Sequence, residues 1–261
     1  MPRMKDPRTV AERVLAILGA FSKSESELSL SEIAQKADLT LSTAHRRAAE
    51  LVDWGALEKG ADGKYRIGIR LWELAALAPR GMPLRELALP YLRDLLAITG
   101  GNSQLAIRAG TDALFLERLR GRNTFLAVTS AANRLFLPVT AVGLVLLAHA
   151  PPHVQDDVLN GELMALTPYT TVDPQQLREI LAEIRQRGYA NSDQQLQVDT
   201  YSTAAPIFDS TGHVVAAIGL VLGSVKDRSR ATGGVVASAR SLSRMLGSDS
   251  PWNEIDSRIN D

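Results

Sequence analysis

Residues 28–59 read Leu28-Ser-Leu-Ser-Glu-Ile-Ala-Gln-Lys-Ala-Asp-Leu-Thr-Leu-Ser-Thr-Ala-His-Arg-Arg-Ala-Ala-Glu-Leu-Val-Asp-Trp-Gly-Ala-Leu-Glu-Lys59. Ser29 and Glu32 have the spacing of a capping box, which predicts a short helix beginning there. Thr40 is placed to cap a second helix, and Gly55 to end it. Two helices joined by the tight turn at Asp38 form a helix-turn-helix, the arrangement that holds its second helix for a DNA major groove.

The segments on either side complete a winged domain. Thr9 and Glu12 predict a capped first helix that runs to about residue 21. Residues 57–59 and 64–67 have the pattern of two strands, joined by a turn at Asp62-Gly63. An apolar helix follows at 69–78, then the linker Pro79-Arg-Gly81. We therefore expect residues 1–78 to form a winged helix-turn-helix domain with a linker helix.

The rest of the chain alternates strand and helix patterns, so an α+β domain is expected over 79–248 and a frayed tail over 249–261. Asp173-Pro174 predicts a helix start and Gly188 its end. The expected elements are helices at 83–99 (kinked or restarted at Pro90), 139–149, 173–188 and 231–246, and strands at 103–108, 113–119, 124–129, 200–208 and 213–222.

The second helix of the motif predicts the DNA contacts. If Ala44, Ala48, Leu51 and Val52 form its buried stripe, the opposite face carries Arg46. A bidentate contact of Arg46 with guanine would contribute about 1–3 kcal/mol of discrimination. Hydroxyls near the helix start and basic residues on the wing are suited to phosphate. The predicted DNA-binding residues are Thr40, Ser42, Thr43, His45, Arg46, Arg47, Lys59, Lys64 and Arg66.

Two alternatives to DNA binding stay open. These basic residues can be an ordinary solvated face, although the complete order of helices and hairpin argues against it. The winged helix can also contact protein, as in a metabolite-binding adaptor. The net charge of zero keeps the second alternative open, because phosphate binding usually leaves a basic excess. Residues 1–78 hold 12 basic and 11 acidic side chains, so any positive face is local.

Several other classes of protein lack support. The chain has no cysteine, which excludes disulfides and thiolate zinc sites and fits a cytoplasmic protein. No secretory signal or membrane-spanning run is present. His149 and His153 have a metal-ligand spacing, but Pro151-Pro152 interrupts any helix between them. Because no nucleophile elbow, Walker A or dinucleotide fingerprint is found, neither catalysis nor a cofactor is expected.

With these residues in place, the chain resembles the IclR family of bacterial transcriptional regulators over nearly its whole length. The resemblance rests on an opening helix, a recognition helix, a wing-to-linker motif and three blocks in the second half. These are Arg13-Val-Leu-Ala-Ile-Leu18, Leu41-Ser-Thr-Ala-His-Arg46, Tyr65-Arg-Ile-Gly-Ile-Arg-Leu-Trp-Glu-Leu-Ala75, the block 137–148, Ile184-Arg-Gln-Arg-Gly-Tyr-Ala190 and the block 204–217.

The resemblance implies a GAF-like effector-binding domain, built on a curved antiparallel sheet with helices. It also implies homodimers formed largely through the N-terminal domains, often paired into homotetramers. Such dimers read near-palindromic operators in double-stranded DNA, and the second copy doubles the phosphate contacts. Effector identity, operator sequence and the sign of regulation stay open.

Departures from the family pattern concern the effector site. The family's acidic loop is here Ser192-Asp-Gln-Gln195, in which Asp193 alone is charged, and a family glycine is replaced by Asp199. Serine hydroxyls expected at Gly219 and Val221 are missing. A pocket with fewer donors implies an aromatic or fairly apolar effector, unless these positions are simply packed core. The expected effector-binding residues are Leu146, Asp193, Thr200, Ser202, Gly219 and Val221.

Overall fold

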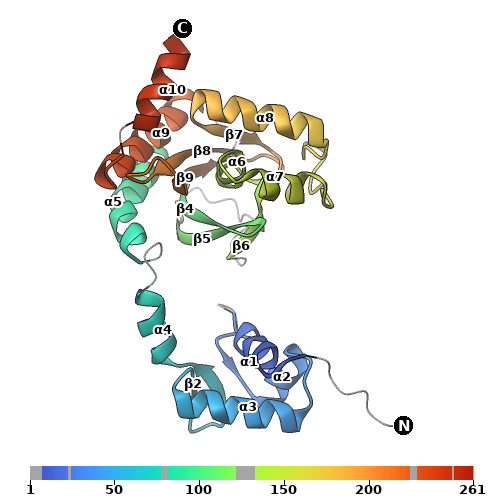
Figure 1. Ribbon diagram of the computed structural model, residues 1–261. Helices are drawn as coiled ribbons and strands as arrows, with labels where there is room; N and C mark the ends of the chain where they lie inside the picture. Colours follow the sequence, from blue (N-terminus) through green and yellow to red (C-terminus); the bar gives the residue numbers. More distant parts are fainter. Residues whose placement is uncertain are drawn as a thin grey trace. The chain divides into compact units, whose positions relative to one another are not determined.

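The computed structural model describes residues 8–22, 25–77, 82–121, 133–223, 228–248 and 250–260 (Figure 1). The chain divides into two compact units, residues 1–81 and 82–261. The strand expected at 124–129 and the linker Pro79-Arg-Gly81 lie outside the described residues. Each unit is considered by itself below.

The first unit is a helix-turn-helix with a three-stranded sheet, as the sequence predicts. Thr9 and Ser29 each form the expected capping box with the glutamate three residues later. The strands are antiparallel in the order β1-β3-β2, and β1 is an element that the sequence pattern did not indicate. The elements are α1 (Val10–Gly19), β1 (Glu27–Leu28), α2 (Leu30–Lys36), α3 (Leu41–Trp54), β2 (Leu57–Lys59), β3 (Tyr65–Ile67) and α4 (Ile69–Ala76).

The second unit is built on a six-stranded antiparallel sheet in the order β6-β5-β4-β9-β8-β7 (Figure 1). Helix α5 continues through Pro90. The elements are α5 (Met82–Thr99), β4 (Asn102–Ala109), β5 (Asp112–Leu119), β6 (Arg134–Phe136), the 3-10 turn η2 (Leu137–Val139), α6 (Ala141–Ala148), α7 (Pro152–Leu159), α8 (Pro174–Arg187), β7 (Ala190–Asp193), β8 (Tyr201–Phe208), β9 (Val214–Leu222), α9 (Arg228–Met245) and α10 (Ser250–Asn260).

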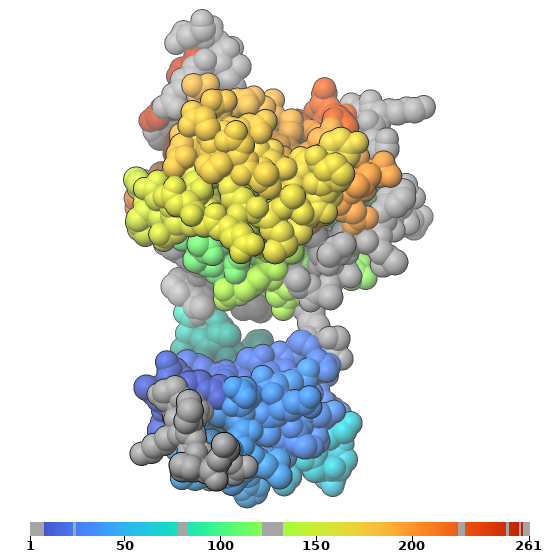
Figure 2. Space-filling model, turned by 90° about the vertical axis from the view of Figure 1, so that its right-hand side faces the viewer, coloured from blue at the N-terminus to red at the C-terminus, as the bar shows by residue number. Residues whose placement is uncertain are grey.

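Side-chain alternation along the strands divides this unit into two cores. Ala106, Ala204 and Ala217 pack against α6, α7 and α8 on one face, whereas their neighbours Leu105 and Ile218 pack against α5, α9 and α10 on the other. We call these the α6 face and the α9 face. Small residues on the α6 face let the fully buried helix α6 approach the sheet closely. In Figure 2, α7, α8 and the segment between them form the outer yellow layer.

The expected tail after Ser248 is instead the helix α10, which belongs to the second unit. Trp252 and Ile255 are buried, and the Trp252 indole N–H donates to the Ser243 hydroxyl at 3.1 Å. The Trp252 ring also meets Phe208 edge-on, with centroids 5.7 Å apart. Two apolar anchors in an otherwise polar segment are too few to produce a helical period in the sequence, so this element was missed.

Candidate DNA-binding helix and effector cavity

Helix α3 has the boundaries and the buried stripe that its sequence predicts. The Thr40 hydroxyl accepts a hydrogen bond from the Thr43 amide at 3.3 Å, which caps the first turn. Gly55 ends the helix with φ +87°, a backbone conformation that favours glycine. Ala44, Ala48 and Leu51 are buried and Val52 is half-buried. The face of α3 that packs against the rest of the unit therefore consists of a few apolar residues, and the opposite face can carry polar side chains.

The turn before α3 fixes the angle between the two helices of the motif. Asp38 adopts φ +51°, in the left-handed region where aspartate is tolerated better than most residues. The Arg8 guanidinium donates to the Ala37 carbonyl at 2.9 Å and to the Asp38 carbonyl, so that it caps the end of α2. These hydrogen bonds restrain the turn, and the turn restrains the orientation of α3 relative to α2.

The outer face of α3 carries the polar side chains that the sequence assigned to DNA. Ser42, His45 and Arg46 are exposed, and Thr43 is half-buried. Within the described part of the chain, Arg46 has no hydrogen-bond or ion-pair partner. Its guanidinium therefore keeps all of its donors for an external acceptor, as a bidentate base contact requires.

Two of the predicted basic residues are already engaged within the unit. The Arg47 Nη1 group donates to both carboxylate oxygens of Glu50, at 2.6 and 2.7 Å, and Arg66 pairs with Glu58 at 3.0 Å. Lys59 lies over the Tyr65 ring at 5.3 Å from its centroid, and Lys64 is exposed on the turn side of the hairpin. The carboxylates next to Arg47 and Arg66 reduce the local positive charge, which leaves Arg46 and Lys64 as the more available cations.

The second unit contains a small enclosed cavity on the α6 face of the sheet. Its volume is about 30 Å³, which is room for a water or two. Thr200, Ser202 and Val221 line it, as the sequence analysis expects for an effector pocket. The other lining residues are Gln104, Phe115, Leu135, Val139, Thr140, Ser192, Leu196 and Gln197.

The other three expected effector residues lie elsewhere. Leu146 is buried in the core of the α6 face. Gly219 is packed beneath Val142, so closely that an added Cβ would lie 2.7 Å from the Val142 Cγ1 atom. Asp193 faces the other side of β7. The structure thus brings together half of the expected set, because residue spacing in the sequence does not reveal which sheet positions α6 covers.

One wall of the cavity is the connection between β7 and β8, residues 194–200. Gln194 and Asp199 adopt left-handed backbone conformations, with φ +56° and +61°. The Gln194 amide donates to the Thr200 carbonyl at 2.8 Å and closes the loop. From outside, the Thr167 and Thr170 hydroxyls donate to the carbonyls of residues 194 and 195 at 2.7 and 2.6 Å. Hydrogen bonds therefore hold the wall in place. Its path depends on the left-handed backbone of Gln194 and Asp199, a conformation that residues with a Cβ rarely adopt.

Three polar residues that line the cavity, Gln104 of β4, Thr140 before α6 and Ser192 of the edge strand β7, were not among the expected effector-binding residues. Gln104 and Ser192 are buried, and Thr140 caps α6 through the Gly143 amide at 3.0 Å. A buried glutamine inside the apolar stretch of β4 is an available signal, since buried polar groups are uncommon in such strands. Strand β7 itself was expected as a loop, because Asn191, Ser192 and Asp193 are poor strand formers.

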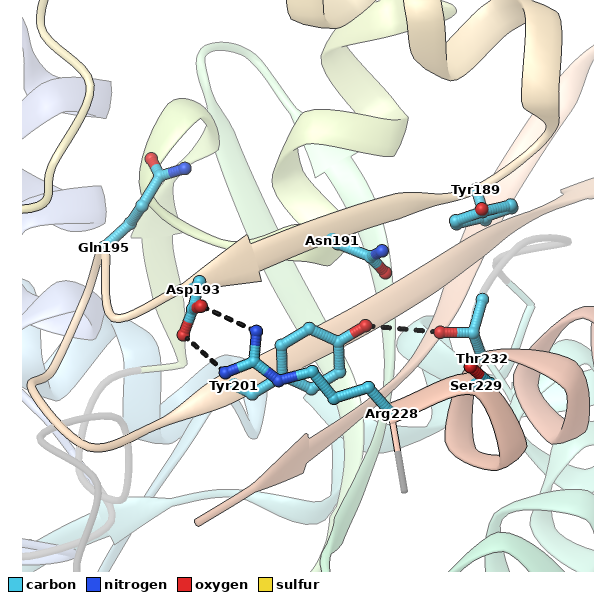
Figure 3. Close-up of a pocket in the computed structure, with 8 residues that line it drawn as sticks. All are labelled: Tyr189, Asn191, Asp193, Gln195, Tyr201, Arg228, Ser229 and Thr232. Carbon is cyan, nitrogen blue, oxygen red and sulfur yellow. Dashed lines mark hydrogen bonds and ion pairs between the residues drawn. The ribbon is translucent and has the colours of Figure 1, made fainter. Parts of the chain in front are cut away.

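A second, open pocket of about 530 Å³ lies on the α9 face beside β7 (Figure 3). Arg228 crosses it, bonded to the two Asp193 carboxylate oxygens at 2.7 and 3.3 Å and stacked on the Tyr201 ring at 4.6 Å. The Tyr201 hydroxyl lies 3.3 Å from the Thr232 hydroxyl. The Arg228 guanidinium neutralises the Asp193 carboxylate, so the two side chains together add no net charge to the pocket.

Among the described residues, no cluster of three His, Cys, Asp or Glu side chains is arranged to hold a metal ion. In the same part of the chain, none of the helices combines the length and apolarity needed to span a membrane.

Comparisons with known proteins agree with this architecture. Residues 10–61 match the IclR helix-turn-helix domain, and residues 77–246 match the domain described as bacterial transcriptional regulator IclR C-terminal. The transcriptional repressor AllR of Escherichia coli is 30% identical over 246 residues, covering 90% of this chain and 89% of AllR. The regulator BhcR of Paracoccus denitrificans is 34% identical over 209 residues, covering 79% and 75%. The chain therefore belongs to the IclR family of transcriptional regulators, whose relatives are named regulators and repressors rather than enzymes.

Solved structures show the same fold over about nine-tenths of the chain. The crystal structure of an IclR homolog from Microbacterium hydrocarbonoxydans, complexed with 4-hydroxybenzoate, superposes with a TM-score of 0.85. It is 33% identical and covers 91% of this chain and 99% of that one. The Thermotoga maritima IclR structure is 26% identical, with a TM-score of 0.70, and covers 91% and 98%.

Proposed function

We propose that this protein is a ligand-responsive, cytoplasmic transcriptional regulator that binds a near-palindromic operator through α3 and the β2–β3 wing. The observation that carries the proposal is Arg46, which has no hydrogen-bond or ion-pair partner among the described residues and lies on the exposed face of a capped helix. Arg46 reads a base, and the hydroxyls of Thr40, Ser42 and Thr43 and the wing cations contact phosphate. His45 and Arg47 flank the reading face.

The operator-binding species is a homodimer, with pairing of dimers into a tetramer. Helix α4 supports this, because it buries none of its residues within its own unit. Ile69 and Trp72 of α4 are 63% and 57% exposed, and Leu77, which caps its C-terminal end, is 77% exposed. Large apolar side chains gathered on one helix are typical of an interface, and a second copy of α4 offers the same chemistry.

The effector binds in the cavity lined by Thr200, Ser202 and Val221. An aromatic, fairly apolar molecule suits the lining of Phe115, Leu135 and Val139. The 4-hydroxybenzoate held by the Microbacterium hydrocarbonoxydans homolog is a molecule of this class. Because the cavity is far smaller than such a molecule, binding displaces one of its walls and thereby alters the effector domain.

The experiment is fluorescence anisotropy of the full chain with the intergenic DNA beside its own gene, with unrelated DNA as competitor. Phosphate contact predicts that the logarithm of the binding constant falls steeply with the logarithm of salt, with a slope of about −0.9 for each phosphate neutralised. We expect competitor-resistant binding with a slope of at least about −4.

Weak binding that competitor removes would contradict operator recognition. Absence of binding at every salt concentration, with and without 4-hydroxybenzoate, would favour the adaptor alternative, in which the winged helix contacts protein. The matched control is Arg46→Ala in the same titration, because it separates base reading from general phosphate attraction.

A further inference from the structure

Strand β5 contains an irregularity beside the cavity. In its register with β4, Gln104 pairs with Arg118 and Leu105 with Glu117, but Ala106 pairs with Phe115. Leu116 is thus an extra residue without a partner on β4, which is a β-bulge. Such bulges re-aim side chains and are frequent next to functional sites.

The bulge changes which side chains share a face. In a regular strand, residues three apart point to opposite faces of the sheet. The extra residue cancels this, so Phe115 and Arg118 both face the α6 side. The Arg118 guanidinium lies over the Phe115 ring, 3.5 Å from its centroid. Phe115, which the guanidinium covers, and Gln104, which pairs with Arg118 in the sheet, line the cavity.

The adjacent anion is directed away from the cavity. Glu117 pairs across the sheet with Leu105, a residue of the α9-face core, and its carboxylate forms an ion pair with Arg85 of α5 at 2.5 Å. The bulge therefore sorts two consecutive charges, with the cation on the cavity side and the carboxylate on the helix side. Without it, Arg118 and Phe115 could not meet.

The Arg118 guanidinium carries its positive charge in a partly buried position, where loss of hydration makes a charge unfavourable. Its side chain is partly buried, and burial, followed by repulsion from Arg120, lowers the pKa of Arg118 to about 10. The guanidinium still carries its proton at neutral pH. An anion brought beside it would be bound by charge-assisted hydrogen bonds in partly desolvated surroundings, where such bonds are strong.

We propose that Arg118 binds the carboxylate of the effector, and that the effector is a small aromatic acid whose ring packs between Phe115 and the apolar side chains Leu135 and Val139. This rests on the proposed effector function of the cavity and names the ligand class. Arg118 supplies the anion-binding group that the last strand lacks at Gly219 and Val221. The bulge at Leu116 is what makes one strand provide both the ring contact and the cation.

The test measures calorimetric affinity of the full chain for 4-hydroxybenzoate and for 4-hydroxybenzamide, which has the same shape without the charge. We expect the wild type to bind the acid at least about tenfold more tightly than the amide. Arg118→Gln should remove that preference and change the affinity for the amide by less than about threefold, whereas Arg118→Lys should retain part of it.

The matched control is Arg134→Gln, on the neighbouring strand β6. Arg134 is exposed and precedes Leu135, which lines the cavity, so its side chain points to the other face. We expect it to keep the preference of the wild type for the acid. Equal affinity of the wild type for acid and amide would overturn the proposal without any variant, and so would an unchanged preference in Arg118→Gln.

The outcomes separate this proposal from the function on which it rests. A wild type that binds its intergenic DNA but neither probe overturns the aromatic-acid assignment and leaves the regulator function standing. A wild type that binds the acid through Arg118 but no DNA supports the ligand class and contradicts operator binding.

Discussion

Helix α3 and the effector cavity place their functional groups in opposite ways. In α3, three small or apolar residues pack the inner face and Arg46 lies on the outer one, so packing and the proposed base contact use different side chains. In the cavity, Phe115 both packs the α6-face core and lines the site. A substitution should therefore act on binding alone in the first region, and on binding and stability together in the second.

The largest expected difference comes from a leucine-to-alanine substitution made once on α3 and once in the α6-face core, which Phe115 also packs. Leu144 of α6 is fully buried, whereas Leu41 of α3 is 55% exposed. Leu144→Ala should cost about 2–5 kcal/mol of unfolding free energy through lost burial and a residual cavity. Leu41→Ala should cost less than about 0.5 kcal/mol. Urea denaturation followed by circular dichroism measures both, and equal losses would remove the distinction.

A second expectation concerns pH and the core behind the cavity. His149 meets Phe208 edge-on with centroids 5.6 Å apart, and burial, with a smaller contribution from Arg185, lowers the pKa of His149 from 6.5 to about 4. The unfolded chain thus takes up this proton first. The stability that neutral His149 contributes is complete above pH 6.5 and is lost as pH falls toward 4. At about 1.36 kcal/mol for each unit of pKa, the loss is about 3 kcal/mol.

The measurement is the unfolding free energy in urea between pH 7.5 and 4.5 for the wild type and for His149→Phe. The variant retains a ring for the edge contact and has no group to protonate. We expect its stability to fall less steeply over this range. Parallel curves would show that His149 does not contribute to the acid sensitivity.

These regions also differ in how far the sequence could predict them. The first unit depends on local signals, such as the boxes at Thr9 and Ser29 and the cap at Thr40, and its helices were predicted with their caps. Strand β1 was missed because it has two residues, Glu27 and Leu28, which are too few to show the alternation of a strand. It is a strand only because it pairs with β3. Local chemistry was sufficient there because each signal acts within one helical turn.

The cavity depends on contacts between residues distant in sequence. Thr200, Ser202 and Val221, which were expected in the effector site, line the cavity, but Gly219, two residues from Val221, is covered by Val142. The bulge at Leu116 could not be read from β5 either, because it exists only in the register with β4. The sequence could predict which residues lie on a strand, but not which of them a helix covers.

Arg46→Ala tests whether the outer face of α3 acts on binding alone. We expect it to lose about 1–3 kcal/mol of discrimination between operator and unrelated DNA, with unchanged unfolding free energy. Arg47→Ala is the matched control, because its guanidinium is already held by Glu50 and should contribute less to base reading. Competition anisotropy measures both variants. A greater loss of discrimination in Arg47→Ala than in Arg46→Ala would assign the base contact to Arg47 instead of Arg46.

The smallest expected effect sharpens the comparison at the cavity wall. Asp199 adopts φ +61°, and the family resemblance places a glycine near this position. A left-handed backbone costs a residue with a Cβ about 1–2 kcal/mol, so Asp199→Gly should be more stable than Asp199→Ala by about 1 kcal/mol. In a helix the order is reversed: at the exposed Asp157 of α7, Gly should be about 1 kcal/mol less stable than Ala. Denaturation of the four variants checks the inversion. The same order at both sites would mean that the wall is not strained at Asp199, and that its shape comes from its hydrogen bonds, which include those of Thr167 and Thr170 and that between Gln194 and Thr200.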